Sequence, residues 1–167
     1  MTSSASARPP AFARADIIER TLELVGERGV DPTPQVYERL FAMHPQMQAH
    51  FWRDTTGAIR GEMLSRTFEA ILDFVGERKY AGHMIGTEMV THEGYDVPRE
   101  IFATFFGVVA DTLREILADD WTAEIDSAWR DLLAEIDGYA NRTPRSDVTA
   151  AAFTEMRQAF EARGGAA

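Results

Sequence analysis

The sequence contains no cysteine and fewer basic than acidic side chains, and each deficit excludes several classes of protein. Without cysteine the chain forms no disulfide, iron–sulfur cluster, thiolate zinc site or cysteine nucleophile. With 17 basic and 27 acidic residues, the net charge of −10 argues against a protein that coats nucleic acid or an anionic membrane. The longest apolar stretch, Ile101 to Ala110, is too short to span a bilayer, and the polar N-terminus lacks the apolar core of a signal peptide. We therefore expect a soluble, cytoplasmic domain.

Apolar residues recur at helical spacing along most of the 167 residues, and no segment shows the alternation of a half-buried strand. This length suits one domain-sized hydrophobic core. We predict a leader over residues 1–15, a helical domain over 16–140, and a linker with an amphipathic helix over 141–167. The fold class is therefore all-α, with about seven to eight helices, the last of them an extra C-terminal helix.

Capping residues and prolines predict where the helices begin and end. Asp16 and Thr33 are expected to cap the first two helices, and the second helix ends at His44-Pro45 before a short helical turn. Thr122 is expected to cap the last helix of the domain. Between these points the apolar spacing predicts long helices over residues 58–77, 80–92 and 98–117.

The four histidines do not form a zinc motif; they are His44, His50, His83 and His92. No two of them are four residues apart and no His-Glu-x-x-His sequence is present, which argues against a dedicated zinc site. The chain also lacks a glycine-rich phosphate loop and a Gly-x-Ser-x-Gly nucleophile motif. The acidic residues are best explained as a solvated surface. These patterns do not indicate a hydrolase or a phosphoryl-transfer enzyme.

His92 is the histidine with the most distinctive surroundings. It ends a predicted helix, precedes a turn over residues 93–97, and is followed by a long apolar and aromatic helix. A histidine at a helix C-terminus is commonly a favourable partner of the helix dipole and nothing more. The other hypothesis, that His92 is a metal ligand, depends on the rest of the chain.

The order and spacing of several motifs resemble those of bacterial globins over residues 16–140. The second globin helix, its corner proline and the phenylalanine that contacts haem are matched by Tyr37-Glu38-Arg39-Leu40-Phe41, His44-Pro45-Gln46-Met47 and Phe51. The proximal histidine, the turn after it and the two long helices that follow are matched by His92-Glu93-Gly94-Tyr95-Asp96-Val97, residues 98–117 and residues 122–140. The likeness is closest to single-domain bacterial globins and to the haem domain of flavohaemoglobins.

The resemblance implies one haem b and a set of residues around it. His92 would be the axial ligand of the iron, with its other ring nitrogen held by a carbonyl or carboxylate. Phe51 would press on the porphyrin face, and Tyr37 would hydrogen-bond the gas ligand. Counting back from His92 puts the distal position on Arg60, and Gly61 beside it would let two helices cross closely. The other implied cofactor contacts are Leu64, Val97 and Phe102.

Simpler explanations remain open for several of these residues. Tyr37 can be a core tyrosine with a satisfied hydroxyl, and Phe51 can belong to the core alone. Arg60 can extend into solvent or meet a haem propionate. Tyr95 can pack within the turn without any chemical role.

Three positions depart from the family pattern. Arg60 stands where relatives carry histidine or glutamine. Glu88 stands one turn before the proximal histidine, where the family usually has an apolar residue, so we expect Met89 to take over that contact. Phe102 stands where flavohaemoglobins keep a tyrosine, which leaves the proximal hydrogen-bond network of their nitric oxide dioxygenase chemistry incomplete.

The function that the resemblance implies is reversible binding of dioxygen, or of NO or CO, at a five-coordinate haem iron. Three alternatives stay open: nitric oxide dioxygenation or peroxidase-like turnover with an external reductase, gas sensing, and a haem-free interaction module. Whether the chain is an enzyme is therefore undecided at this point. The predicted terminal helix carries an apolar stripe that must be covered by the domain or by a partner chain, such as a second copy in a homodimer; the stripe is Phe153, Met156 and Phe160.

Overall fold

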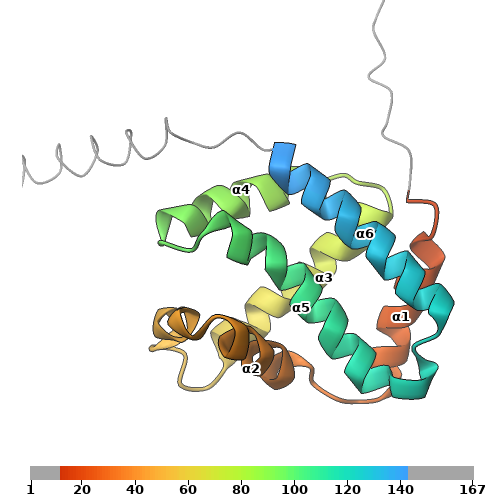
Figure 1. Ribbon diagram of the computed structural model, residues 1–167, viewed down its shortest axis with the longest axis horizontal. Coiled ribbons are helices and arrows are strands. Elements are labelled where there is room, and N and C mark those ends of the chain that lie inside the picture. Colours follow the sequence, from red (N-terminus) through yellow and green to blue (C-terminus); the bar gives the residue numbers. More distant parts are fainter. Residues whose placement is uncertain (1–11, 143–167) are drawn as a thin grey trace, which may run out of the picture.

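The computed structural model describes residues 12–142, and these residues form helices and no strand (Figure 1). In chain order the elements are α1 (Ala15–Glu27), α2 (Thr33–Met43), the 3₁₀ helix η1 (Pro45–Phe51), α3 (Ala58–Val75), α4 (Ala81–Gly94), α5 (Arg99–Leu117), the 3₁₀ helix η2 (Ala118–Asp120) and α6 (Ala123–Arg142). The prediction of an all-α fold is confirmed.

The helix ends follow the predicted caps in part. Thr122 caps α6, because its hydroxyl accepts the N–H of Ile125 at 3.2 Å. Asp16 lies inside the first turn of α1, where its charge acts on the helix dipole. Thr33 is the first residue of α2, and its own N–H donates to the Asp31 carboxylate at 2.9 Å. The predicted capping roles of Asp16 and Thr33 are therefore wrong.

Helix α5 is the central helix of the domain. It crosses in front of α3 in Figure 1 and contacts α1, α2, α4 and α6. Its apolar run is largely buried, since neighbouring helices cover it on several sides. Helix α6 packs on it with Trp129, which is only 1% exposed. The longest apolar stretch of the sequence is thus a core helix.

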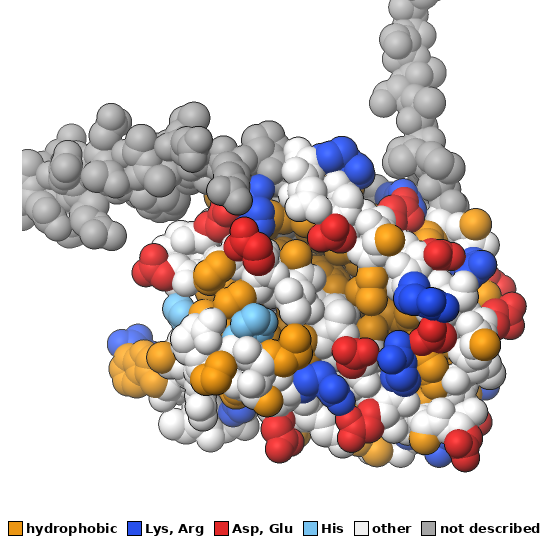
Figure 2. Space-filling view, viewed as in Figure 1, with side chains coloured by type: hydrophobic (Ala, Val, Ile, Leu, Met, Phe, Trp, Pro, Cys, Tyr) orange, Lys and Arg blue, Asp and Glu red, His pale blue; other side chains and the backbone are white. Residues whose placement is uncertain are grey.

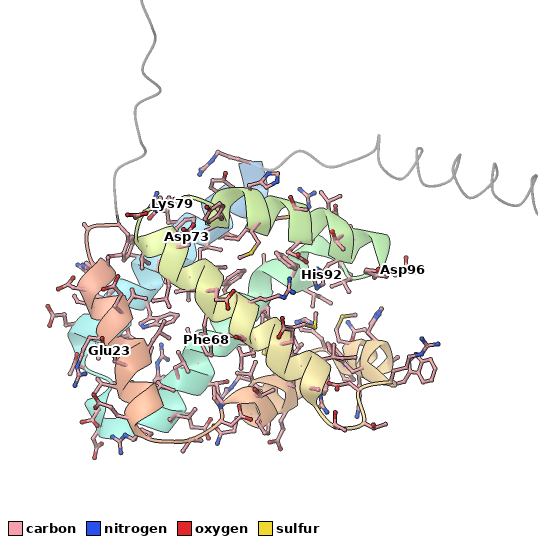
Figure 3. All side chains as sticks on the ribbon, turned by 180° about the vertical axis from the view of Figure 1, so that it is seen from behind. Glu23, Phe68, Asp73, Lys79, His92 and Asp96 are labelled. Atoms are coloured by element: carbon pink, nitrogen blue, oxygen red, sulfur yellow. The ribbon has the colours of Figure 1, made fainter. Side chains whose placement is uncertain are left out.

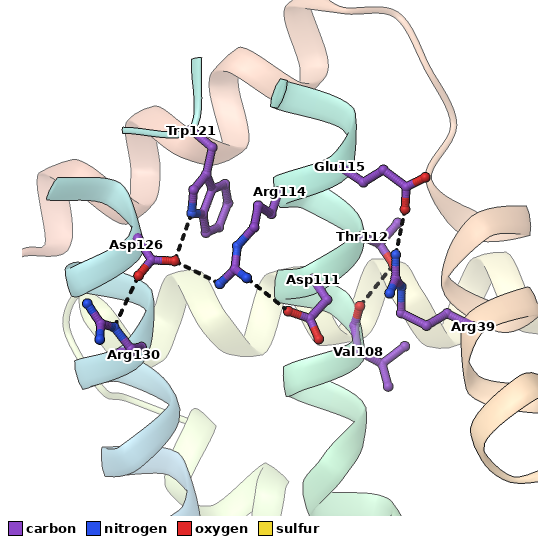
Figure 4. A network of polar contacts seen from close by, with 9 residues as sticks. All are labelled: Arg39, Val108, Asp111, Thr112, Arg114, Glu115, Trp121, Asp126 and Arg130. Atoms are coloured by element: carbon purple, nitrogen blue, oxygen red, sulfur yellow. Dashed lines mark hydrogen bonds and ion pairs between the residues drawn. The ribbon is translucent and has the colours of Figure 1, made fainter. Parts of the chain in front are cut away.

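A polar network holds the start of α6 against the end of α5 (Figure 4). The Asp126 carboxylate accepts hydrogen bonds from Trp121 Nε1 at 3.1 Å and from the Arg114 guanidinium at 2.7 Å. Arg130 Nε lies 3.1 Å from the second oxygen. The hydrogen bond from Trp121, together with the charges of Arg114 and Arg130, lowers the pKa of Asp126. These contacts fix the reversal of the chain between the two helices.

Two predicted segments lie wholly or largely outside the described residues. They are the leader over residues 1–15 and the C-terminal segment over 141–167, of which only residues 12–15 and 141–142 are described. The expected helix that begins near Ser146 is among the residues not described. Within residues 12–142, no helix has the length and apolar character needed to cross a membrane.

Candidate functional site

A cavity of about 660 Å³ lies within the part of the chain that the structure describes. Its volume falls within the range of roughly 300–1,000 Å³ that small-molecule sites usually have. The walls come from α2, η1, α3, α4 and α5, and their side chains are mostly apolar. In Figure 2, pale-blue histidine side chains lie among orange apolar ones between the regions of α4 and α2. The opening is marked by the exposed lining residues, which are His50, Ile59, Arg66, Thr91 and Tyr95.

His92 reaches this cavity from the last turn of α4, on the side that faces α3 (Figure 3). Its Nδ1 lies 2.7 Å from the backbone carbonyl oxygen of Glu88. Because a carbonyl can only accept, Nδ1 carries the hydrogen and Nε2 keeps a free lone pair. The ring packs on Phe102, with 5.0 Å between ring centroids. This is the arrangement that a histidine needs in order to bind a metal through Nε2.

The turn after His92 is fixed by backbone hydrogen bonds. The carbonyl oxygen of His92 accepts the N–H groups of Tyr95 and Val97, each at 3.0 Å. Asp96 has a left-handed φ of 61°, a conformation that aspartate tolerates better than most residues. Val97 therefore lies in the cavity wall, next to the end of α4.

An aromatic cluster forms the α2 and η1 part of the cavity wall. Tyr37 and Phe51 meet edge to face, with 5.2 Å between ring centroids. Tyr37 also packs on Phe41 at 5.9 Å and on Phe105 at 5.6 Å. Both Tyr37 and Phe51 line the cavity, as do Val97 and Phe102. The structure thus brings these four predicted residues together with His92 around one space.

The Tyr37 hydroxyl is a buried donor. The residue is only 2% exposed, and this burial raises the pKa of its hydroxyl above the ordinary value for tyrosine. The nearby charge of Arg60 lowers that pKa by a smaller amount, and the charge of Asp54 raises it. The hydroxyl is consequently protonated at neutral pH and can donate a hydrogen bond into the cavity.

Two of the predicted α3 residues, Arg60 and Leu64, are not among the residues that line the cavity. The side chain of Asp54 is 1% exposed and accepts Arg60 Nε at 2.9 Å. The same carboxylate accepts the backbone N–H groups of Arg60 and Ile59 at 3.0 and 3.1 Å. These bonds hold the guanidinium of Arg60 at the start of α3, while Leu64 is buried in the core.

A different set of α3 residues faces the cavity. They are Ile59, Met63, Arg66, Thr67 and Ala70. Their spacing follows one face of a helix, and a shift of one residue turns that face by about 100°. A Cβ built on Gly61 meets no atom of another element within 4 Å, so the close helix crossing expected at this glycine is absent.

Helix α4 contributes Glu88 to the cavity and keeps Met89 out of it. Met89 is fully buried in the core, whereas the side chain of Glu88 is 43% exposed and belongs to the cavity wall. The expectation that Met89 takes over the contact of Glu88 is therefore not met. The spacing of Ile85, Glu88 and His92 along one helix face was the signal that could have identified Glu88.

The Asp54 carboxylate gives a testable dependence of stability on pH. Burial by itself would raise the pKa of Asp54, but the hydrogen bonds from Arg60 and Ile59 outweigh it and hold the pKa below its ordinary value. A carboxyl whose pKa is lowered in the folded chain stabilises the fold at every pH above the ordinary carboxyl pKa. This stabilisation is lost as the pH falls through the lowered pKa. We expect Asp54→Asn to reduce the free energy of unfolding at pH 7. The difference from the unchanged chain should begin to shrink as the pH falls below about 4, the ordinary value for a carboxyl, and should be lost once the pH is below the lowered pKa of Asp54.

Urea unfolding at pH 7 and at a series of acidic pH values measures this difference. Asp119→Asn, at an exposed carboxylate of η2, is the matched control and should change little at any pH. An unchanged free energy of unfolding in Asp54→Asn at pH 7 would show that the carboxylate does not stabilise α3.

The fold and the cavity define an all-α protein in which His92 faces a largely apolar site, and comparison with known families agrees. The sequence pattern of the globin family matches residues 34–139. The chain therefore belongs to the globin family, for which haem is the implied cofactor and a diatomic gas the implied ligand. A comparison with curated proteins found no match, and neither did a comparison with solved structures.

The residues around the cavity fit a haem group. The walls supply apolar and aromatic surface for a porphyrin, and His92 offers a ligand nitrogen whose partner nitrogen is already engaged. Arg66 and His50 stand at the opening, where the carboxylates of a haem would meet solvent. These residues supply the apolar surface, the ligand nitrogen and the cationic edge that a haem requires.

Proposed function

We propose that this globin holds one haem b in the cavity, with His92 as the axial ligand, and that it binds a diatomic gas reversibly on the α3 side. The observation that supports this most strongly is the state of His92. Its Nδ1 donates to the Glu88 carbonyl at 2.7 Å, which leaves Nε2 available beside an apolar cavity of about 660 Å³. Haem held by one histidine supplies an iron with an open position for a gas.

Different side chains of the cavity would make different kinds of contact with the haem. Phe51, Val97 and Phe102 provide apolar contact, and the two phenylalanines add large aromatic surface. Arg66 is the proposed partner of a haem carboxylate, because it lines the cavity and a guanidinium can pair with a carboxylate through two parallel hydrogen bonds. Its Nε donates to Glu62 at 3.0 Å, but both side chains of that pair are exposed, unlike the carboxylate of Asp54. Arg60 does not have this role in the proposal, since Asp54 engages its guanidinium.

The gas side of the site is defined by Tyr37 and by the cavity face of α3. Tyr37 is the proposed donor to the gas, because this residue lines the cavity and its buried hydroxyl stays protonated. Met63 and Thr67 face the same space from α3. Among these three, Tyr37 combines a strong donor with a fixed position, since three aromatic rings pack around it.

Reversible binding is favoured over the enzymatic alternative by Phe102. This residue packs on the His92 ring at 5.0 Å and has no polar atom to offer it. The tyrosine-based proximal network associated with nitric oxide dioxygenation in flavohaemoglobins is therefore lacking at this position. Nitric oxide dioxygenation or peroxidase-like turnover would also require a source of electrons for the iron.

An absorption spectrum of the purified chain with added haem tests the proposal. We expect a Soret band that saturates at one haem per chain, a five-coordinate ferrous spectrum, and a further shift with CO. No Soret band would reject haem binding and favour a haem-free interaction module. A six-coordinate ferrous spectrum without added gas would reject the open site and point to an internal ligand such as His50 or Met63.

A further inference from the structure

Glu88 presents two acceptors to the same nitrogen of His92. Its backbone carbonyl oxygen lies 2.7 Å from Nδ1, and its carboxylate Oε2 lies 3.7 Å from the same atom. Residues four apart are neighbours on a helix surface, so rotation of the Glu88 side chain alone can close the second distance. Glu88 also lines the cavity, as His92 does, so both residues lie on the same face of α4.

We propose that the Glu88 carboxylate shares the Nδ1–H of His92 and makes this histidine a stronger electron donor to the haem iron. This rests on the proposed function, in which His92 is the axial ligand. A hydrogen bond to a charged acceptor is stronger than one to a carbonyl, and partners of this kind raise the basicity of a metal-bound histidine. Glu88 is thus a positioning residue that favours the ferric over the ferrous haem.

Glu88 is the residue whose side chain can accept the Nδ1–H of His92 among the neighbours that the structure describes. Phe102 covers another side of the ring and offers no acceptor, and within residues 12–142 both acceptors near Nδ1 come from Glu88. The next residue, Met89, is fully buried and points into the core. Glu88 is half-exposed, so its carboxylate can move toward Nδ1 without disturbing the packing of the domain.

The test compares Glu88→Gln with Asp96→Asn in the full-length chain loaded with haem. Both substitutions remove one carboxylate charge near the end of α4, and Figure 3 shows Asp96 at the turn beyond His92. Asparagine tolerates the left-handed φ of position 96, so the control keeps the backbone. The readouts are the iron–histidine stretching frequency of the ferrous protein, by resonance Raman, and the reduction potential, by spectroelectrochemistry.

We expect Glu88→Gln to lower the iron–histidine stretching frequency and to raise the ferrous-to-ferric ratio at fixed potential about tenfold. That ratio corresponds to about 59 mV for a one-electron couple. Asp96→Asn should leave the stretching frequency unchanged. Glu88→Leu, which restores the apolar residue usual in relatives, should act in the same direction and at least as far.

Two results would overturn the inference, and a third concerns the proposed function instead. An unchanged stretching frequency in both Glu88 variants would mean that the carboxylate does not engage Nδ1. Equal shifts of potential in Glu88→Gln and Asp96→Asn would mean that Glu88 acts only as a surface charge. Absence of any iron–histidine band in the unchanged, haem-loaded chain would contradict His92 as the ligand and thus the proposed function itself.

Discussion

His92→Ala is expected to release haem at least about a hundredfold faster than the unchanged chain, a larger effect than we expect from any other single substitution. Replacing even a residue that only orients a metal ligand commonly costs ten- to a hundredfold in affinity, so loss of the ligand itself should cost more. The apolar walls would remain, and haem would still partition weakly into the cavity. Transfer of haem to an excess of a high-affinity apoprotein, followed by absorption, measures the rate.

His83→Ala is the matched control for this experiment. His83 lies on the same helix α4, is exposed, and does not line the cavity. Its substitution should leave the rate of haem loss and the ferrous CO spectrum unchanged. The same holds for His44→Ala. His50 borders the cavity and can contact a haem carboxylate, so His50→Ala should change the rate of haem loss far less than His92→Ala and should leave the ferrous CO spectrum unchanged. A normal ferrous CO spectrum in His92→Ala would contradict the assignment of His92 as the axial ligand.

The fold was predictable because its helices carry strong local signals. Pro98 directly precedes α5 and Thr122 caps α6, and both lie where the sequence predicts a helix start. The break between α2 and η1 falls at His44-Pro45, since proline cannot continue the preceding helix. The starts of α1 and α2 lie one or two residues before the predicted ones, and neither helix has a side-chain cap to mark its first residue.

The residues predicted from the segment around His92 line the cavity, whereas the sequence does not indicate which residues of α3 do so. A short turn fixed by backbone hydrogen bonds separates His92 from Val97 and Phe102. The spacing of these three residues in the sequence therefore determines how they lie relative to one another. Between Phe51 and α3, by contrast, the chain runs through a polar loop whose length no periodic pattern constrains. A register uncertain by one residue is enough to exchange a cavity-facing residue for one that faces elsewhere.

An ion pair with a buried carboxylate explains why Arg60 does not line the cavity. The sequence indicates a charged residue near the distal position but not its partner, because Asp54 is six residues earlier in the loop. In the fold, Asp54 accepts three hydrogen bonds from Ile59 and Arg60 and is nearly inaccessible to solvent. The guanidinium of Arg60 therefore remains paired with Asp54 and does not turn toward the cavity, since separation would leave a buried carboxylate unpaired.

Tyr37→Phe is expected to raise the dissociation rate of dioxygen by roughly ten- to a hundredfold and to change that of carbon monoxide much less. Dioxygen bound at a haem acquires partial negative charge, whereas carbon monoxide does so far less, so a hydrogen-bond donor discriminates between them. A hydrogen bond to a charged group contributes about 1.5–3 kcal/mol, and about 1.4 kcal/mol corresponds to tenfold. Phenylalanine keeps the packing on Phe41, Phe51 and Phe105, so the variant removes the hydroxyl alone. Flash photolysis and stopped-flow mixing give both rates.

Arg60→Leu is the control that separates a direct donor from a nearby charge. Because Asp54 holds the Arg60 guanidinium at the start of α3, this variant should alter the dioxygen dissociation rate less than Tyr37→Phe does. It should instead lower the free energy of unfolding, since it strips a buried carboxylate of its partner. A dioxygen effect equal to that of Tyr37→Phe would mean that the guanidinium leaves Asp54 and reaches the gas. Dissociation rates near those of the unchanged chain in both variants would mean that neither residue contacts the gas, and gas sensing or haem-free interaction would then be favoured over a tuned dioxygen site.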